Sequence, residues 1–434
     1  MLLSIPMRAP WLALSLLLVF TPAVSLYASE EPAVPLDLHD ALVRTLASSP
    51  TLAIYPWWER ADNARVLQAG LRPNPELAAE IENIAGSGVY SGTSAMNLTL
   101  ALSQVIELGD KRDYRRLAAA SESRLTRFDY ELARLDVLAE TARRFVDVAR
   151  DRAFLDLAHR ASALAAAAEE VAGQRVASGR SPAAERSQAR IERARIEIDR
   201  EHAEHQLATA RMRLAASWGE THAGFGDVRA DLHALPSIPS LDDLLARVDE
   251  APGIERYLAV ERVAAAREEL ARANARQDLR VGLGIRHFED TSDQAFLLQL
   301  SMPLPVANRN EGAIAAARAD QHITQAQRHR SRIETHAVLF GLYQELAHAR
   351  TEAATLQSEV LPEAQSMMEL VGEGYREGRF SYLELSAARR QLLEVEGAAI
   401  DAFAQAHKLL IELERLTGLP LLVQTSPAHA EKNP

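Results

Sequence analysis

The histidines have the spacing that could bind a transition metal. His202 and His205 are three residues apart in a helical segment, and His322, His329 and His336 recur every seven residues on one helix face. Paired imidazoles can ligate zinc, copper or nickel. No carboxylate completes a set of ligands, and 13 histidines in a helical chain produce chance pairs. We interpret these histidines as part of a polar helix face and predict no metal site.

Catalytic arrangements find little support. The chain has no cysteine, which excludes thiol nucleophiles, thiolate metal sites, disulfides and a lipid anchor on cysteine. His39-Asp40 and the scattered serines lack the setting that a catalytic triad needs. A formal net charge of -12 argues against a nucleic-acid partner. The sequence predicts a protein that is not an enzyme and uses no cofactor.

Charged residues also occur on segments with the period of a two-faced strand. Apolar and polar residues alternate over 76–83, 97–108, 278–288 and 295–304. The charged residues of the polar faces are Glu76, Glu80, Glu82, Glu107, Asp278, Arg280 and Arg286. The apolar faces include Leu98, Leu100, Leu102, Phe296, Leu298 and Leu300. Such strands fit a membrane barrel with a polar lumen and lipid outside, or a soluble sheet packed on helices.

Each strand pair leads into a long helical hairpin, and this plan occurs twice. Gly173, Glu185 and Gly219 correspond to residues 372, 384 and 418, at a constant separation in sequence. Repeat one covers 36–230, with a β-hairpin at 76–108 and a helical hairpin at 112–218. Repeat two covers 236–425, with a β-hairpin at 278–304 and a helical hairpin at 312–417. Three-and-four spacing of apolar residues from Leu125 to Phe145 predicts coiled coil in the first long helix.

The N-terminus predicts export from the cytoplasm. Arg8 precedes an apolar run over 11–20, which small residues follow, so 1–28 reads as a cleaved signal peptide. The run is too short to span a bilayer, so any membrane crossing falls to the strands. The polar segment 426–434 is predicted to be a disordered tail.

Geometry then demands several copies of the chain. Four strands cannot close a membrane barrel, because the smallest such barrels use about eight and open edges cannot face lipid. Two copies would give a narrow barrel, whereas three copies would give about twelve strands around a lumen. A helix of sixty-odd residues is about 90–100 Å long and needs neighbours from other copies. We therefore predict a mostly α fold with membrane β: a trimeric 12-stranded β-barrel continued by a long α-helical coiled-coil barrel.

Three segments resemble the TolC-like outer-membrane efflux family, and specifically its CzcC-type heavy-metal branch. They are the sequence GLRPNPEL at 70–77, LSQVIELGDKR at 102–112 and GYREGRFSYLEL at 374–385. The resemblance covers about 36–421 and implies an internally duplicated TolC-like fold and a homotrimer. It implies a passive exit duct for heavy-metal cations in the cell outer membrane, extending into the periplasm. The implied partners are a periplasmic adaptor (membrane fusion protein), an inner-membrane proton-driven RND pump and outer-membrane lipid.

The resemblance also assigns roles to residues near the helix turns. In the family these turns contact the adaptor, and here they include Gly179, Arg180, Ser181, Tyr375, Gly378, Arg379 and Ser381. An acidic residue just past the second turn helps to form a constriction ring, and Glu384 matches it. Its counterpart Glu185 is better explained by the helix dipole beside Pro182, where we expect Ser181 to cap the return helix. The companion acidic position of the ring is Ala387 here.

Two alternatives stand beside a metal-efflux duct. One is an outer-membrane channel of the same family for drug efflux or type I protein secretion. The other, from a different class, is a periplasmic coiled-coil structural protein without a pore. Fractionation with the outer membrane and conductance in planar bilayers would separate a pore-forming protein from the second alternative.

Overall fold

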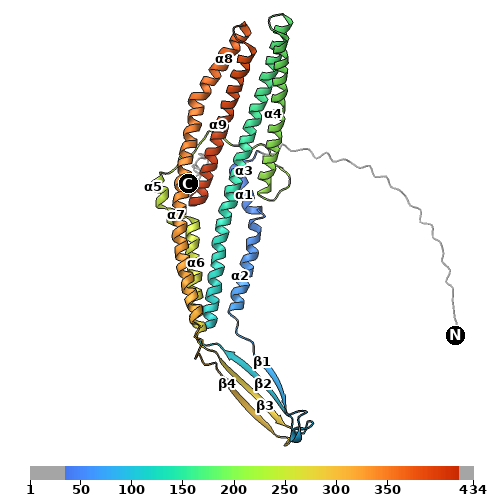
Figure 1. The fold of residues 1–434 in the computed structure, drawn as a ribbon, viewed down its shortest axis with the longest axis vertical. Helices are drawn as coiled ribbons and strands as arrows, with labels where there is room; N and C mark the ends of the chain where they lie inside the picture. The colour runs from blue at the N-terminus through green and yellow to red at the C-terminus, as the bar shows by residue number, and fades with distance from the viewer. Residues whose placement is uncertain (1–34, 420–434) are drawn as a thin grey trace, which may run out of the picture.

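The computed structural model describes residues 35–419. The predicted signal peptide, 1–28, and the predicted tail, 426–434, lie outside these residues. The molecule is elongated, with a β-sheet at one end and two helix turns at the other (Figure 1). The helices run lengthwise between these two ends, so the long helix that follows a strand extends away from the sheet (Figure 1).

Four antiparallel strands form a single sheet in the order β1-β2-β3-β4. They are β1 (Glu76–Glu82), β2 (Asn97–Ile106), β3 (Leu279–Phe288) and β4 (Gln294–Ser301). The two hairpins are joined through the pairing of β2 with β3, in which Leu100 lies opposite Ile285. The outer strands β1 and β4 each keep one unpaired edge, which is the part of a sheet that can pair with another strand.

The helices follow the same order in both halves of the chain. The first half has α1 (Leu38–Ser48), α2 (Tyr55–Ala69), α3 (Lys111–Ala177) and α4 (Ala183–Ala216). The second has α5 (Leu241–Ala246), α6 (Pro252–Asn274), α7 (Glu311–Thr355), α8 (Leu361–Glu377) and α9 (Tyr382–Thr417). The predicted two-repeat architecture is confirmed. At 67 residues, α3 is about 100 Å long.

The two long helices differ in continuity. The first, α3, is unbroken, whereas its counterpart in the second repeat is interrupted by a π-helical segment, Leu356–Val360, between α7 and α8. Pro362 follows directly and has no N–H to donate to the preceding turn. π-Helical turns and prolines are the usual causes of a bend in a helix. Both of these causes of a bend therefore occur together at 356–362.

The helix α3 is the centre of the packing. Near the sheet it lies between α2 and α6, and α7 packs on the far side of α6. Near the turns it lies between α4 and α9, and α8 packs on the far side of α9. The lateral order is therefore α2-α3-α6-α7 at one level and α4-α3-α9-α8 at the other. The elements at the two lateral edges are β1, α2 and α4 on one side and β4, α7 and α8 on the other.

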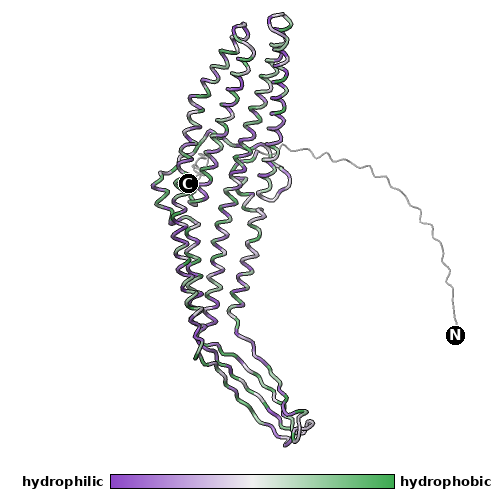
Figure 2. The backbone as a smooth tube through the Cα atoms, in the orientation of Figure 1, coloured by the Kyte–Doolittle hydropathy of each residue, from purple (hydrophilic) through white to green (hydrophobic). Residues whose placement is uncertain are grey.

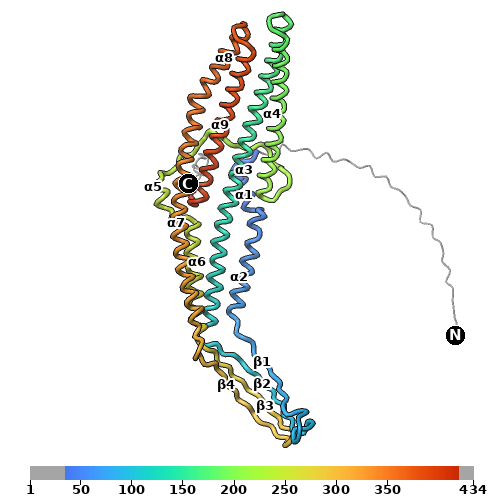
Figure 3. The backbone as a smooth tube through the Cα atoms, in the orientation of Figure 1, coloured from blue at the N-terminus to red at the C-terminus, as the bar shows by residue number. Residues whose placement is uncertain are grey.

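The segment that connects the repeats crosses the middle of the molecule (Figure 3, yellow-green). It pairs with the residues just before α1 through a parallel bridge, in which Leu36 N donates to Asp227 O at 3.0 Å. Further along, Leu232 O lies 2.9 Å from His407 Nε2 of α9. Burial lowers the pKa of His407, so the neutral imidazole is favoured there. The connection thus fastens the first repeat to α9.

Polar and apolar residues alternate along the helices, as the colours of Figure 2 show. Among residues 35–419, no helix carries an apolar stretch of the length needed to cross a membrane.

Left-handed backbone marks both junctions between sheet and helix. Asp110, before α3, has φ 55°, and Asn310, before α7, has φ 62°. Gly109 has φ 79°, and a Cβ atom there would lie 2.5 Å from Arg276 Cδ. Glycine tolerates this conformation because it has no Cβ. The turn from β2 into α3 therefore requires a glycine at 109.

Replacing this glycine should destabilise the junction. We expect Gly109→Ala to lower the free energy of unfolding by about 1–3 kcal/mol, since it combines left-handed backbone with a steric clash. Gly312→Ala, near the second junction, is the control, because no atom lies within 4 Å of its would-be Cβ. Thermal melting followed by circular dichroism measures both. A Gly109→Ala protein as stable as Gly312→Ala would contradict the assignment.

Candidate functional site

The sheet has one polar and one apolar face, as the register shows. Directly opposed residues share a face in an antiparallel sheet, so the pairs Glu80–Thr99 and Thr99–Arg286 place these three side chains together. On the other face Leu77, Leu102, Leu283 and Leu298 form a continuous row. The structure therefore brings together the strand residues that the alternating pattern assigns to each face.

Ion pairs occupy most of the charges on the polar face. Arg280 binds Glu76 and donates from Nη1 to Ser103 Oγ at 3.2 Å. Arg286 lies 3.1 Å from Glu82, between Nη2 and Oε2. Glu80 is exposed and has no such partner among residues 35–419. The face carries three carboxylates and two guanidinium groups.

Glu107 does not belong to the sheet. The strand β2 ends at Ile106, one residue before it. The Glu107 carboxylate instead binds Arg115 of α3, and Arg115 also donates from Nε to Ala69 O at 3.3 Å. Lys111, in the same helix, lies 2.8 Å from Asp278 Oδ1, just before β3. These contacts give Glu107 a role in fixing the junction between strand and helix.

The apolar face is open over its whole width. Its exposed side chains include Leu98, Leu100, Leu102, Phe296, Leu298 and Leu300. Phe296 is 90% exposed and Leu298 is 68% exposed. None of the helices among residues 35–419 covers this face, because they extend away from the sheet toward the other end of the molecule (Figure 1). An apolar surface of this kind marks a site of contact with lipid or another protein.

The opposite end of the molecule consists of the α3–α4 and α8–α9 turns. Gly179 (φ 71°) and Gly378 (φ 82°) adopt left-handed backbone that turns the chain at each point. The exposed turn residues are Gly179, Arg180, Gly378, Arg379 and Ser381. Ser181 is partly buried, and its hydroxyl accepts from Arg175 Nε at 3.1 Å. The expectation that Ser181 caps α4 is wrong: the cap position is Pro182, without a side-chain cap bond.

Tyr375 joins the two turns and is buried, at 2% exposure. Its hydroxyl donates to Glu185 Oε1 at 2.5 Å, and the Arg175 guanidinium lies 4.6 Å from its ring centre. Burial and this hydrogen bond raise the pKa of Tyr375 well above its ordinary value. The side chains of Tyr375 and Glu185 thus connect α8 to α4 inside the molecule and are not part of the exposed surface of the turns.

A second tyrosine–glutamate pair lies next to the first and was not evident in the sequence. Tyr382 donates to Glu192 Oε2 at 2.7 Å, and Arg389 Nη1 lies 3.5 Å from Glu192 Oε1. Arg389 is 2% exposed, so its charge is buried with a single carboxylate beside it. Burial raises the pKa of Tyr382, and the hydrogen bond to Glu192 raises it further. The two glutamates, Glu185 and Glu192, are seven residues apart on α4 and therefore lie on the same helix face. This spacing is the feature of the sequence that could have indicated the second pair.

Glu384 forms a capping box at the start of α9. Its Oε2 accepts from Ser381 N at 2.7 Å and from Ser381 Oγ at 2.8 Å, and Glu384 N donates back to Ser381 Oγ at 3.3 Å. The Ser-Tyr-Leu-Glu order at 381–384 is the sequence signature of this motif. The bond from the Ser381 backbone, with that from its hydroxyl, lowers the pKa of Glu384. The carboxylate is exposed, so capping does not remove it from solvent.

The capping contact of Glu384 and its predicted role in a gate can be separated by mutation. Glutamine also serves in a capping box, so Glu384→Gln should keep the melting temperature while lowering cation selectivity in planar bilayers. Glu384→Ala should also lower the melting temperature. Because the folded-state pKa is depressed, the stabilisation is present above the unfolded pKa and is lost as pH falls through the folded value. The difference in melting temperature between Glu384→Ala and the unaltered protein should therefore narrow in acid. Unaltered reversal potentials for Glu384→Gln would contradict a role of Glu384 in the gate.

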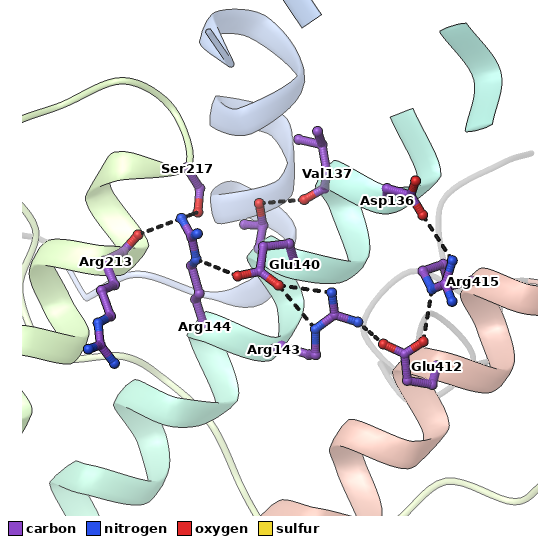
Figure 4. Close-up of polar contacts among 10 residues, drawn as sticks. Asp136, Val137, Glu140, Arg143, Arg144, Arg213, Ser217, Glu412 and Arg415 are labelled. Atoms are coloured by element: carbon purple, nitrogen blue, oxygen red, sulfur yellow. Dashed lines mark hydrogen bonds and ion pairs between the residues drawn. The ribbon is translucent and has the colours of Figure 1, made fainter. Parts of the chain in front are cut away.

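An ion-pair network joins the repeats halfway along α3 (Figure 4). Arg143 of α3 binds Glu140 at 2.8 Å and also Glu412 of α9. Arg144 donates from Nη1 to Arg213 O at 3.0 Å and to Ser217 Oγ at 3.1 Å, at the C-terminal end of α4. Arginine at a helix C-terminus satisfies carbonyl groups that lack an intrahelical partner. The network aligns α3 with the ends of α4 and α9.

The candidate metal-binding histidines do not converge. His202 and His205 are exposed on α4, and Gln206 Nε2 lies 2.9 Å from His202 Nε2. His322 and His329 are exposed on α7, and His336 is partly buried. Within residues 35–419, no three or more His, Asp or Glu side chains come together in a way that could hold a metal ion.

Comparison with known proteins identifies a matching family and several related proteins. The family model described as outer membrane efflux protein matches residues 41–220 and 259–419. The chain is 28% identical over 397 residues to the cobalt-zinc-cadmium resistance protein CzcC of Cupriavidus metallidurans, covering 89% of this chain and 91% of that protein. It is 26% identical over 338 residues to the nickel-cobalt-cadmium resistance protein NccC of Alcaligenes xylosoxydans xylosoxydans, covering 76% and 73%.

Solved structures share the fold at low sequence identity. The crystal structure of CusC has a TM-score of 0.73 at 16% identity, covering 91% of this chain and 95% of that chain. The outer membrane protein VceC of Vibrio cholerae has a TM-score of 0.66 at 21% identity, covering 88% and 96%. These similarities confirm the predicted duplicated fold.

Proposed function

Because the chain belongs to the outer membrane efflux protein family, we propose that it is the outer-membrane channel of a tripartite, RND-type efflux system for heavy-metal cations. The observation that carries the proposal is the sheet, which presents an exposed apolar face to one side and paired charges to the other. Such a sheet is suited to lipid outside and water inside. The resistance proteins that it resembles supply the cargo class.

The lateral edges support a closed homotrimer. A barrel requires β1 of one copy to pair with β4 of the next, and the helices at these same edges would then meet as well. On α2, Trp57 and Leu67 are exposed, and on α7, Ile333 and Phe340 are exposed. Ile191 of α4 and Leu370 of α8 are exposed at the other level. We infer that one rotation between copies would bring exposed apolar side chains together at both helical levels, with about twelve strands in the barrel.

The exposed turns are the surface proposed for the adaptor. Gly179 and Gly378 shape them, and Arg180 and Arg379 project from them. The buried Tyr375–Glu185 pair holds the turns beside each other from within. An adaptor linked to an inner-membrane pump would reach the duct at this end, since the sheet occupies the other end (Figure 1).

Deletion of the gene in its host tests the cargo. We expect sensitivity to cobalt, zinc, nickel or cadmium salts to rise, and plasmid-borne expression to restore resistance. A rise in sensitivity to drugs alone, or loss of a secreted polypeptide, would favour the drug-efflux or secretion alternative. Drug sensitivity and the secreted proteins are therefore measured in the same strains.

Biochemical fractionation tests the pore. The protein should fractionate with the outer membrane, run as a trimer after mild detergent extraction and conduct ions in planar bilayers. A periplasmic monomer without conductance would contradict the proposal and favour a coiled-coil structural protein.

A further inference from the structure

We propose that Glu80 is the residue that makes the barrel lumen selective for cations, as a ring of three unpaired carboxylates. This inference rests on the proposed function, because it requires the trimeric pore. The other acidic side chains predicted to line the lumen are Glu76, Glu82 and Glu107, and each of them has an arginine partner. Glu80 alone contributes a charge that no neighbouring side chain balances among the described residues.

The arginine closest in register to Glu80 is held away from it. Arg286 lies in the same cross-strand row as Glu80, with Thr99 between them. Arg286 donates from Nε to Thr99 Oγ1 at 2.8 Å, while its Nη2 lies 3.1 Å from Glu82. Thr99 is buried, so this bond fixes the guanidinium in place. The row therefore keeps one arginine on Glu82 and leaves Glu80 facing solvent.

Closure of the barrel would not neutralise Glu80 either. β1 is an edge strand, so its second neighbour in a closed ring is β4 of another copy. The polar face of β4 carries Ala295, Leu297, Gln299 and Ser301, none of which is charged. One net negative charge per copy remains on the polar face of the barrel. Charges of one sign in a channel with low-dielectric walls raise the local concentration of counter-ions.

The chemistry that follows is a passive filter for hydrated cations. A lone carboxylate per copy attracts a cation without supplying the several ligands that tight binding needs. Metal ions would be enriched in the lumen and released again. This suits a duct that must pass its cargo onward.

Reversal potentials of the full-length protein in planar bilayers test the assignment. In a KCl gradient at about 0.1 M, where the Debye length is about 10 Å, Glu80→Gln should lower the potassium-to-chloride permeability ratio about two- to fivefold, because the three charges are only partly screened. The difference in permeability ratio between Glu80→Gln and the unaltered protein should vanish at about 1 M KCl, where the Debye length is about 3 Å. Glu80→Lys should move the ratio further in the same direction, and it provides a second measurement if one variant assembles poorly.

The matched control removes a neutral pair from the same face. Glu82→Gln/Arg286→Gln deletes equal and opposite charges and should leave the permeability ratio unchanged. An unchanged ratio in Glu80→Gln channels, or an equal fall in the double variant, would overturn the role of Glu80 while leaving the pore intact. Absence of conductance in the unaltered protein would overturn the proposed pore, and this assignment with it.

Discussion

Leu298→Arg is expected to block insertion of the channel into the outer membrane. Leu298 lies opposite Leu283 in the row of leucines on the apolar face, and it is 68% exposed in the single chain. An arginine on the lipid-facing side of a barrel costs about 2–4 kcal/mol at mid-bilayer depth. Three copies would carry this cost three times. Fractionation should show little trimer in the outer membrane.

The adjacent residue provides the control for this experiment. Gln299 lies opposite Gly282, on the polar face of the same strand. Gln299→Arg introduces the same charge into the same edge strand, but on the side proposed to face the lumen. It should assemble normally and shift ion selectivity toward anions. Equal trimer yields from the two variants would show that the apolar face does not contact lipid.

Glu192→Gln is expected to cause a large loss of stability at the end of the molecule that holds the helix turns. The change removes the carboxylate that pairs with the buried guanidinium of Arg389, whose buried Nε atom has no hydrogen-bond partner among residues 35–419. Removing one partner of a buried ion pair typically costs about 3–5 kcal/mol. The bond from Tyr382 to residue 192 would also weaken, because its acceptor loses its charge. Thermal melting of the detergent-solubilised protein measures the loss.

Glu169→Gln, on the neighbouring helix α3, is the matched control. Glu169 lies 2.9 Å from Arg193, which is 55% exposed, so solvent screens the pair. Exposed ion pairs typically contribute about 0–1 kcal/mol. Glu169→Gln should melt close to the unaltered protein, and a similarly small effect of Glu192→Gln would show that the Arg389 charge is compensated in another way.

The overall fold could be predicted because its periodicities are long and regular. A period of two over β2 and β3 identified the strands and their faces, and apolar spacing of three and four identified α3. Duplication strengthened these predictions, because each element had a second copy. The strand end was harder to place: the alternation continues through Glu107, whereas pairing stops at Ile106, where the chain turns toward Gly109.

The polar contacts of the candidate site could be predicted only in part. Glu384 follows Ser381 at the spacing of a capping box, so this contact is local and could be recognised from the sequence. Glu76 and Arg280 are 204 residues apart, and Tyr375 and Glu185 are 190 apart. Such pairs depend on how strands and helices from different repeats are placed side by side. Ser181 shows that a local pattern can also mislead: the sequence predicts that it caps α4, but its hydroxyl accepts a hydrogen bond from Arg175 instead.

The unequal long helices have a mechanical consequence. The unbroken α3 is a stiff rod that reaches from the sheet to the far turn, whereas the path through α7 and α8 has a joint at Leu356–Val360. Under a lateral load on the α8–α9 turn, we expect bending at this segment before bending in α3. The α8–α9 turn could then shift relative to the sheet without displacing the strands that we propose to contact lipid.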